Sequence, residues 1–147
     1  MPGWIYRAIS VDYVDLLYVG KTVDIRMTRL ASHRNNSPWY AEDVVWETEF
    51  IMGDLRIAEH MRIWCEKPLH NSQRPWPWFF AAQQELRAYV QWIDAKKREV
   101  GRKRSPGAEF WRRQIGLVAP QLKEWVRTCE RMVADSERSR GPAERVS

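Results

Sequence analysis

The chain has 147 residues, of which 44% are hydrophobic and 29% are charged, as in a globular domain. No apolar run approaches the roughly 20 residues of a membrane span, and the first residues lack the order of a signal peptide, so we expect a cytoplasmic protein that does not enter a membrane. The net charge of +5 is uneven, because residues 1–71 hold 8 Lys and Arg against 10 Asp and Glu, whereas residues 72–147 hold 16 against 9. A polyanionic partner would therefore be held by the second half.

The first half alternates between short strands and helices. Residues 4–9 and 16–20 are separated by a turn rich in aspartate, which predicts an antiparallel hairpin. Residues 23–33 have helical periodicity and residues 44–51 alternate as a third strand. Asp54 is a good N-cap for a helix over residues 55–66. Together these elements predict an α+β fold, an α/β sandwich whose small three-stranded mixed or antiparallel sheet is flanked by helices.

The second half is predicted to be a helical extension. Residues 74–82 form a connector rich in proline and aromatic residues, whose rings either pack against the core or stack on exposed bases. Residues 83–98 and 108–116 are predicted helices, and Pro120 is predicted to open a last one. We expect a first domain over residues 1–73, the connector, a basic extension over 83–135 and a flexible tail over 136–147.

Two further features of the extension concern its partners. The run from position 96 to 104 contains six cations, which are candidate nucleic-acid contacts. Residues 122–133 carry an apolar stripe that either packs on the core or forms the seam of a homodimer. Cys65 and Cys129 lie in apolar helical patterns without metal-ligand spacing, and we expect both to be reduced core residues. The six cations are Lys96, Lys97, Arg98, Arg102, Lys103 and Arg104.

The stretch from Leu16 to His33 has the chemistry of a phosphate site. A predicted strand brings Tyr18, Gly20 and Lys21 to the start of a helix that carries two arginines and a histidine on one face. The sequence Gly20-Lys21-Thr22 also imitates the end of a P-loop. That motif requires a glycine where Asp15 stands, so nucleotide binding is rejected. The two arginines and the histidine are Arg26, Arg29 and His33.

The order of these features resembles the GIY-YIG nuclease family. The tripeptide ending in Tyr6 stands where the first signature belongs, with Trp4 in place of its glycine, and Tyr18-Val19-Gly20 matches the second. Arg29 and His33 follow on the helix, and Arg26 is a rival because the interval from Gly20 is one residue longer than in the family. Glu59 and the segment from Pro68 to Asn71 match the family's metal carboxylate and its closing Pro-x-x-Asn. The resemblance covers residues 4–71.

The resemblance implies a metal-dependent endonuclease that hydrolyses double-stranded or branched DNA. Glu59 would bind one Mg²⁺ or Mn²⁺ ion, and a hard cation that keeps its waters needs only one carboxylate. Arg29 would stabilise the phosphoryl charge, while Tyr6 or Tyr18 would activate water with Lys21 and His33 nearby. Asn71 would donate a hydrogen bond to a tyrosine, the backbone or phosphate. The alternatives are a DNA- or RNA-binding module that keeps this fold without cutting and a protein-binding helical adaptor.

Overall fold

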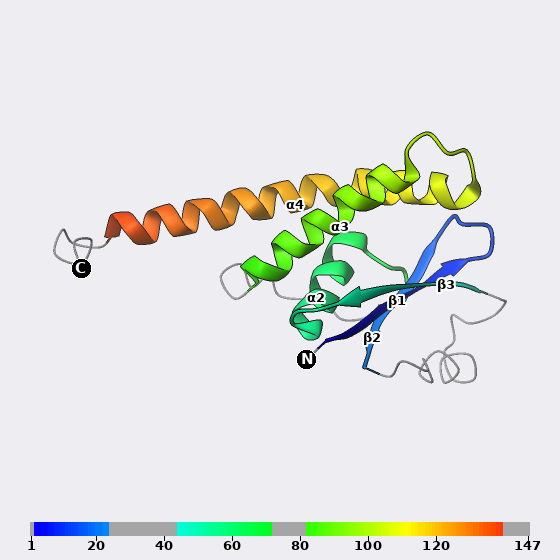
Figure 1. Cartoon of the computed structure of the whole chain (residues 1–147), viewed down its shortest axis with the longest axis horizontal. Coiled ribbons are helices and arrows are strands. Elements are labelled where there is room, and N and C mark those ends of the chain that lie inside the picture. The colour runs from blue at the N-terminus through cyan, green and yellow to red at the C-terminus, as the bar shows by residue number, and fades with distance from the viewer. Residues whose placement is uncertain (1, 24–43, 72–81, 140–147) are drawn as a thin grey trace.

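A computed structural model of the chain describes residues 2–23, 44–71 and 82–139. Three strands form one antiparallel sheet in the order β2-β1-β3, with β1 at Gly3–Ser10, β2 at Leu16–Thr22 and β3 at Val44–Ile51. The helices are α2 at Leu55–Glu66, α3 at Gln83–Val100 and α4 at Pro106–Ser139. The predicted α+β class is confirmed, and the sheet is antiparallel throughout (Figure 1).

The predicted hairpin and its neighbours appear where the sequence placed them. The β1–β2 turn is closed by Ser10, whose hydroxyl accepts hydrogen bonds from the backbone N–H groups of Val14 and Asp15. Asp54 caps α2 as expected, because its side chain accepts the N–H of Ile57 at 3.0 Å. The helix predicted over residues 23–33 and the connector over 74–82 lie largely outside the described residues.

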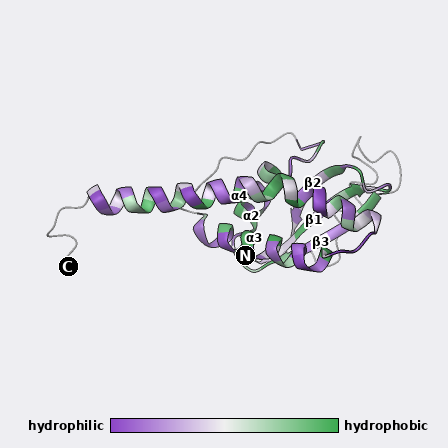
Figure 2. Ribbon diagram, turned by 90° about the horizontal axis from the view of Figure 1, so that it is seen from above, coloured by the Kyte–Doolittle hydropathy of each residue, from purple (hydrophilic) through white to green (hydrophobic). Residues whose placement is uncertain are grey.

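Helix α4 differs from the prediction. The sequence predicted two helices separated near Pro120, but α4 is one continuous helix of 34 residues with Pro120 inside it. An internal proline removes one backbone donor and crowds the carbonyl four residues earlier. Val118, Leu122 and Trp125 on either side of it are nevertheless buried in the core shared with the other helices. This continuous apolar stripe keeps the helix in register through the proline. The last part of α4 extends alone beyond the body of the molecule, as Figures 1 and 2 show from two directions.

The helical extension and the sheet share one core. Ile5 and Ile9 of β1 pack in the same buried cluster as Val100, Phe110 and Trp111 of the extension. A second cluster joins α2, α3 and α4 through residues such as Tyr89, Leu122 and Cys129. Three members of the predicted dimer seam, Leu122, Trp125 and Cys129, are thus buried within the chain itself. None of the described helices is long and apolar enough to span a membrane.

Two arginine and two glutamate side chains are buried between the sheet and the helices. Arg7, fully buried on β1, donates two hydrogen bonds to Glu66 of α2, at 2.7 and 2.8 Å, and one to Glu49 of β3, at 3.0 Å. Arg62 of α2 holds both oxygens of Glu49. Tyr89 of α3 donates its hydroxyl proton to Glu66 at 2.5 Å. We call these four charged residues the buried ion network; its charges sum to zero.

Aromatic rings enclose the buried ion network. The guanidinium carbon of Arg7 lies 4.5 Å from the ring centre of Trp92 and 5.4 Å from that of Trp111. Burial opposes the charge on Glu49, yet Arg62 and Arg7 hold the pKa of that carboxyl below its ordinary value. Similarly, burial opposes the charge on Arg7, but Glu66 keeps its pKa raised. Glu49 and Arg7 therefore stay ionised in the folded protein.

Removing one partner from this network should destabilise the fold strongly. Arg7→Ala leaves two buried carboxylates without their shared cation, which costs about 3–5 kcal/mol in such settings. The exposed Arg131→Ala is the matched control, because its pair with Glu124 lies in solvent, and we expect a change below about 1 kcal/mol. Urea denaturation measures both. A loss below about 1 kcal/mol for Arg7→Ala would contradict the structure.

Both cysteines should be chemically inert in the folded protein. Burial raises the pKa of the Cys65 thiol to about 12, and burial also raises that of Cys129. Because the thiolate is the reactive form, only about one Cys65 in ten thousand is ionised at about pH 8. We expect a thiol reagent to label neither cysteine on the timescale in which it labels both in urea. Fast stoichiometric labelling of native Cys65 would show that this side chain is accessible.

Candidate active site

Four consecutive residues of the outer strand β2 each interact with a residue from elsewhere in the predicted motif. Tyr18 stacks against Tyr6, and Gly20 lies under the ring of Tyr6. Val19 is held by Asn71, and Lys21 pairs with Glu59. We call residues 18–21 and these three partners the β2 site.

The two tyrosines come together on one face of the sheet. Tyr6 is paired in register with Gly20, and Tyr18 with Ala8, so the rings meet diagonally across the hairpin. Their centres lie 6.2 Å apart at an interplanar angle of 28°. A Cβ atom at position 20 would lie 2.3 Å from the hydroxyl oxygen of Tyr6, so only glycine leaves room for this ring. The two tyrosines are therefore in contact across the β1–β2 hairpin.

The tyrosines differ in their access to solvent. Tyr6 is fully buried, and its ring also meets Trp46 of β3 edge to face at 6.0 Å. Tyr18 is half-buried on the outer strand. A side chain that exchanges a proton with water must reach water, so Tyr18 is the better placed of the two. The sequence alone left this choice open.

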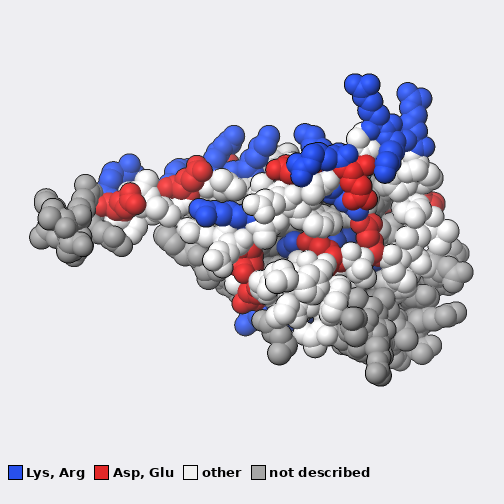
Figure 3. Space-filling view, viewed as in Figure 1, with Lys and Arg blue, Asp and Glu red and all other residues white. Residues whose placement is uncertain are grey.

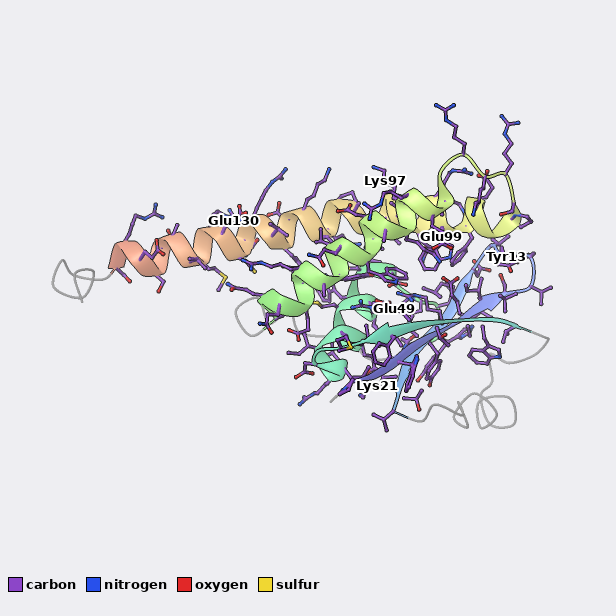
Figure 4. All side chains as sticks on the ribbon, in the orientation of Figure 1. Tyr13, Lys21, Glu49, Lys97, Glu99 and Glu130 are labelled. Atoms are coloured by element: carbon purple, nitrogen blue, oxygen red, sulfur yellow. The ribbon has the colours of Figure 1, made fainter. Side chains whose placement is uncertain are left out.

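Lys21 and Glu59 form the charged part of the β2 site. The ammonium nitrogen of Lys21 lies 3.2 Å from Oε1 of Glu59, with the two side chains 42% and 14% exposed. Strand alternation directs Lys21 toward α2, away from the face that carries Tyr6. The β2 site therefore includes groups from both faces of the sheet, which can approach one another only around the outer strand. Figure 4 shows Lys21 beside the sheet, on the lower side of the view.

His60 is a neighbour of this pair that the sequence analysis did not single out. Burial lowers the pKa of His60, Glu59 raises it, and Arg56 and Lys21 lower it further, with a net decrease. The imidazole is therefore mostly neutral at neutral pH, beside the Glu59 carboxylate. The sequence offered one signal for His60, its position immediately after Glu59. Adjacent residues of a helix point in different directions, so this position does not show that His60 lies near Lys21.

Asn71 holds the outer edge of β2. Its side-chain oxygen accepts the N–H of Val19 at 2.9 Å, and its side-chain nitrogen donates to the carbonyl of the same residue at 2.8 Å. The preceding backbone follows the strand, because the N–H groups of Leu69 and His70 donate to the carbonyls of Leu16 and Leu17. The sequence suggested a tyrosine, the backbone or phosphate as the hydrogen-bond partner of Asn71. In the structure this partner is the backbone of Val19.

The remaining predicted residues divide into three groups. Arg26, Arg29 and His33 lie outside the described residues. Lys96 departs from its expected role as an exposed cation, because its side chain is 12% exposed, lies 2.5 Å from Glu47 and covers the ring of Trp111 at 4.6 Å. A local charge run cannot reveal such a distant partner. The other five members of the run are exposed, namely Lys97, Arg98, Arg102, Lys103 and Arg104.

The donor set limits which metal could bind. Within residues 2–23, 44–71 and 82–139, no group of three or more His, Cys, Asp and Glu side chains is arranged to hold an ion. Glu59 thus offers a single, partly exposed carboxylate already beside a cationic group. This fits an ion such as Mg²⁺, which takes one or two carboxylates and fills its other positions with water and phosphate oxygen. It does not fit zinc, which is usually held by three or four protein ligands.

Comparisons with protein families, with curated proteins and with solved structures return no match for this chain. The residues of the β2 site and their geometry therefore carry the functional argument.

Gly20→Ala should disturb the β2 site specifically. The new methyl group would collide with the Tyr6 ring, displacing it from Tyr18, so we expect a loss of stability of about 1–3 kcal/mol. Gly116→Ala is the control, because a Cβ there meets nothing within 4 Å in the middle of α4, and it should stabilise by about 0.5–1 kcal/mol. Thermal unfolding of both variants measures these opposite effects. Equal stabilisation by the two substitutions would exclude the observed Tyr6 position.

Proposed function

We propose that this chain is a metal-dependent endonuclease of the GIY-YIG type that hydrolyses phosphodiester bonds in DNA. The observation that carries the proposal is the gathering of Tyr6, Glu59 and Asn71 on residues 18–21 of β2. These residues are distant in the sequence, and a phenol, an ammonium group and a carboxylate can supply water activation, charge stabilisation and a metal ligand for phosphodiester hydrolysis.

Glu59 is the residue that would hold the divalent ion, Mg²⁺ or Mn²⁺. When bound there, such an ion supplies charge stabilisation at the scissile phosphate and acidifies a bound water. Lys21 would then bind a phosphate oxygen, since its ammonium group already lies beside Glu59 and its side chain is 42% exposed. Arg29 keeps the role that the resemblance implies, binding two phosphoryl oxygens with its guanidinium group.

Tyr18 is the residue that we assign to activate the attacking water. It is half-buried, so of the two tyrosines it is the one better placed to exchange a proton with water. Tyr6 is a positioning residue, because it is fully buried and fixes the Tyr18 ring by stacking. Asn71 positions the strand itself through its two hydrogen bonds to Val19. A cytoplasmic location agrees with DNA as substrate and stays a prediction.

A second candidate function is binding of DNA or RNA without cleavage. The observation that favours it is the Lys21–Glu59 ion pair, which satisfies the Glu59 carboxylate within the protein itself. In that case Lys21 and Glu59 would only join β2 to α2, and the basic residues of the extension would provide all of the affinity for nucleic acid. The two functions predict different results for a Glu59 substitution.

Incubation with supercoiled plasmid distinguishes these functions. With Mg²⁺ we expect nicked or linear product, and none with a chelator. Glu59→Gln should lower the cleavage rate at least about 100-fold while the DNA dissociation constant stays within about twofold, because the carboxylate acts in the chemical step. Asp15→Asn is the control, since it removes one exposed acid from the β1–β2 turn, and it should cleave as the unmodified protein does.

Two results would contradict the nuclease proposal. The first is binding without turnover on duplex, branched and single-stranded DNA with either metal, which would leave the binding module. The second is undiminished cleavage by Glu59→Gln, which would place the metal elsewhere.

A further inference from the structure

Positive charge is concentrated in the helices α3 and α4 and the turn that joins them. Residues 82–139 hold 13 Lys and Arg against 8 Asp and Glu, a net charge of +5. Residues 2–23 and 44–71 hold 5 against 7, a net charge of −2. The part of the described chain that contains the β2 site is therefore slightly acidic, and the helical part is the one suited to a polyanion.

Exposed cations of this part lie along one edge of the molecule. Lys123, Arg127 and Arg131 recur every four residues, which places them along one face of α4. In Figure 3, Lys and Arg side chains gather along the edge formed by α4 and by the turn after α3. We call this surface the basic ridge. Its members are Lys97, Arg102, Lys103 and Arg104 near the turn, and Lys123, Arg127 and Arg131 on α4.

Most cations of the basic ridge have no acidic partner. Among the described residues, Lys123 and the four members near the turn form no ion pair. On α4, Glu124 lies 3.8 Å from Arg127 and 3.4 Å from Arg131, with all three side chains more than half exposed. Exposed pairs of this kind hold their partners weakly, so both arginines can turn to another anion. The ridge is thus an open site for several negative charges at once.

The dimensions of the ridge suit a rigid, rod-like polyanion. At about 1.5 Å per residue, the helix between Pro106 and Arg131 is about 38 Å long. One turn of duplex DNA is about 34–36 Å long. Cations near the turn and cations around Arg127 can therefore contact phosphates about one helical turn apart. The helix keeps this separation fixed, whereas a flexible basic tail would not.

The basic ridge and the β2 site lie on different sides of the molecule. Figure 4 shows Lys97 over α3 and Lys21 at the opposite side, with Glu49 of the buried ion network between them. An α-helix with its side chains is about 10–12 Å in diameter, and the sheet adds to this thickness. A straight segment of DNA on the ridge consequently cannot also enter the β2 site.

We propose that the basic ridge binds duplex DNA as an anchor, separate from the segment held at the β2 site. The assignment of the ligand as DNA rests on the proposed function, whereas the anchor itself rests on the charges and dimensions of the ridge. Anchoring raises the local concentration of DNA near the β2 site without taking part in cleavage.

Fluorescence anisotropy with a labelled duplex of about 30 base pairs tests the anchor. The triple variant K123Q/R127Q/R131Q should raise the dissociation constant about tenfold at about 100 mM salt and reduce the slope of log K against log salt by about 2–3. Glu124→Gln should have the opposite effect and tighten binding, because it releases Arg127 and Arg131. The single variant Lys123→Gln has a matched control in Lys67→Asn, which removes one exposed lysine outside the ridge, and asparagine suits the left-handed backbone there.

The experiment separates the anchor from the nuclease. A loss of affinity in the triple variant with an unchanged salt slope in Lys67→Asn supports the anchor even if no DNA is cleaved. If the protein cleaves, the triple variant should raise KM at least about fivefold and change kcat less than about twofold. Unchanged affinity and slope in the triple variant would overturn the proposal. A preference for single-stranded RNA over the duplex, lost in the same variant, would overturn DNA as the ligand.

Discussion

The buried ion network decides where the residues of the β2 site lie. Arg62 and Glu66 of α2 bind Glu49 and Arg7 of the sheet, and this fixes one side of α2 against β1 and β3. Glu59 precedes them by three and seven residues and so lies on the same side of the helix. The contacts that bury four charges therefore also direct Glu59 toward Lys21 on β2. Substituting the network with apolar residues could leave the fold stable, but the orientation of α2 would lose its most directional contacts.

The β2 site is assembled from a strand and three partners of different kinds. Tyr6 fills the space that Gly20 leaves, Asn71 replaces a neighbouring strand at Val19, and Glu59 neutralises Lys21. β2 is an outer strand of the sheet, and Tyr18 and Lys21 are the two residues of its segment 18–21 that are not buried. The basic ridge lies across the molecule from this edge (Figures 3 and 4). This arrangement allows the acidic part of the chain to carry the candidate chemistry while the helical part attracts DNA.

Short stretches of sequence were enough to predict most of the strands and helices. The turn after β1, the alternation in β3 and the cap at Asp54 were sufficient for the sheet and for α2. Pro120 was misleading because propensity describes one position, whereas burial on both sides of it extends over several turns. The buried ion network was not foreseen, since partners such as Arg7 and Glu66 are far apart in sequence and resemble surface charges. The contact of Lys96 with Glu47 was not foreseen for the same reason. The residues at positions 6, 18, 59 and 71 were singled out because their order resembles a known pattern, and their role stays a proposal.

The central claim is that the Glu59 carboxylate, held beside β2, is a site for one divalent ion. Titration of the isotope-labelled protein with Mn²⁺, followed by the broadening of backbone amide signals, tests it without requiring any activity. The account predicts that signals of Lys21, Glu59 and His60 broaden first and that Glu59→Gln abolishes this effect. Broadening centred elsewhere, or unchanged broadening in Glu59→Gln, would contradict it.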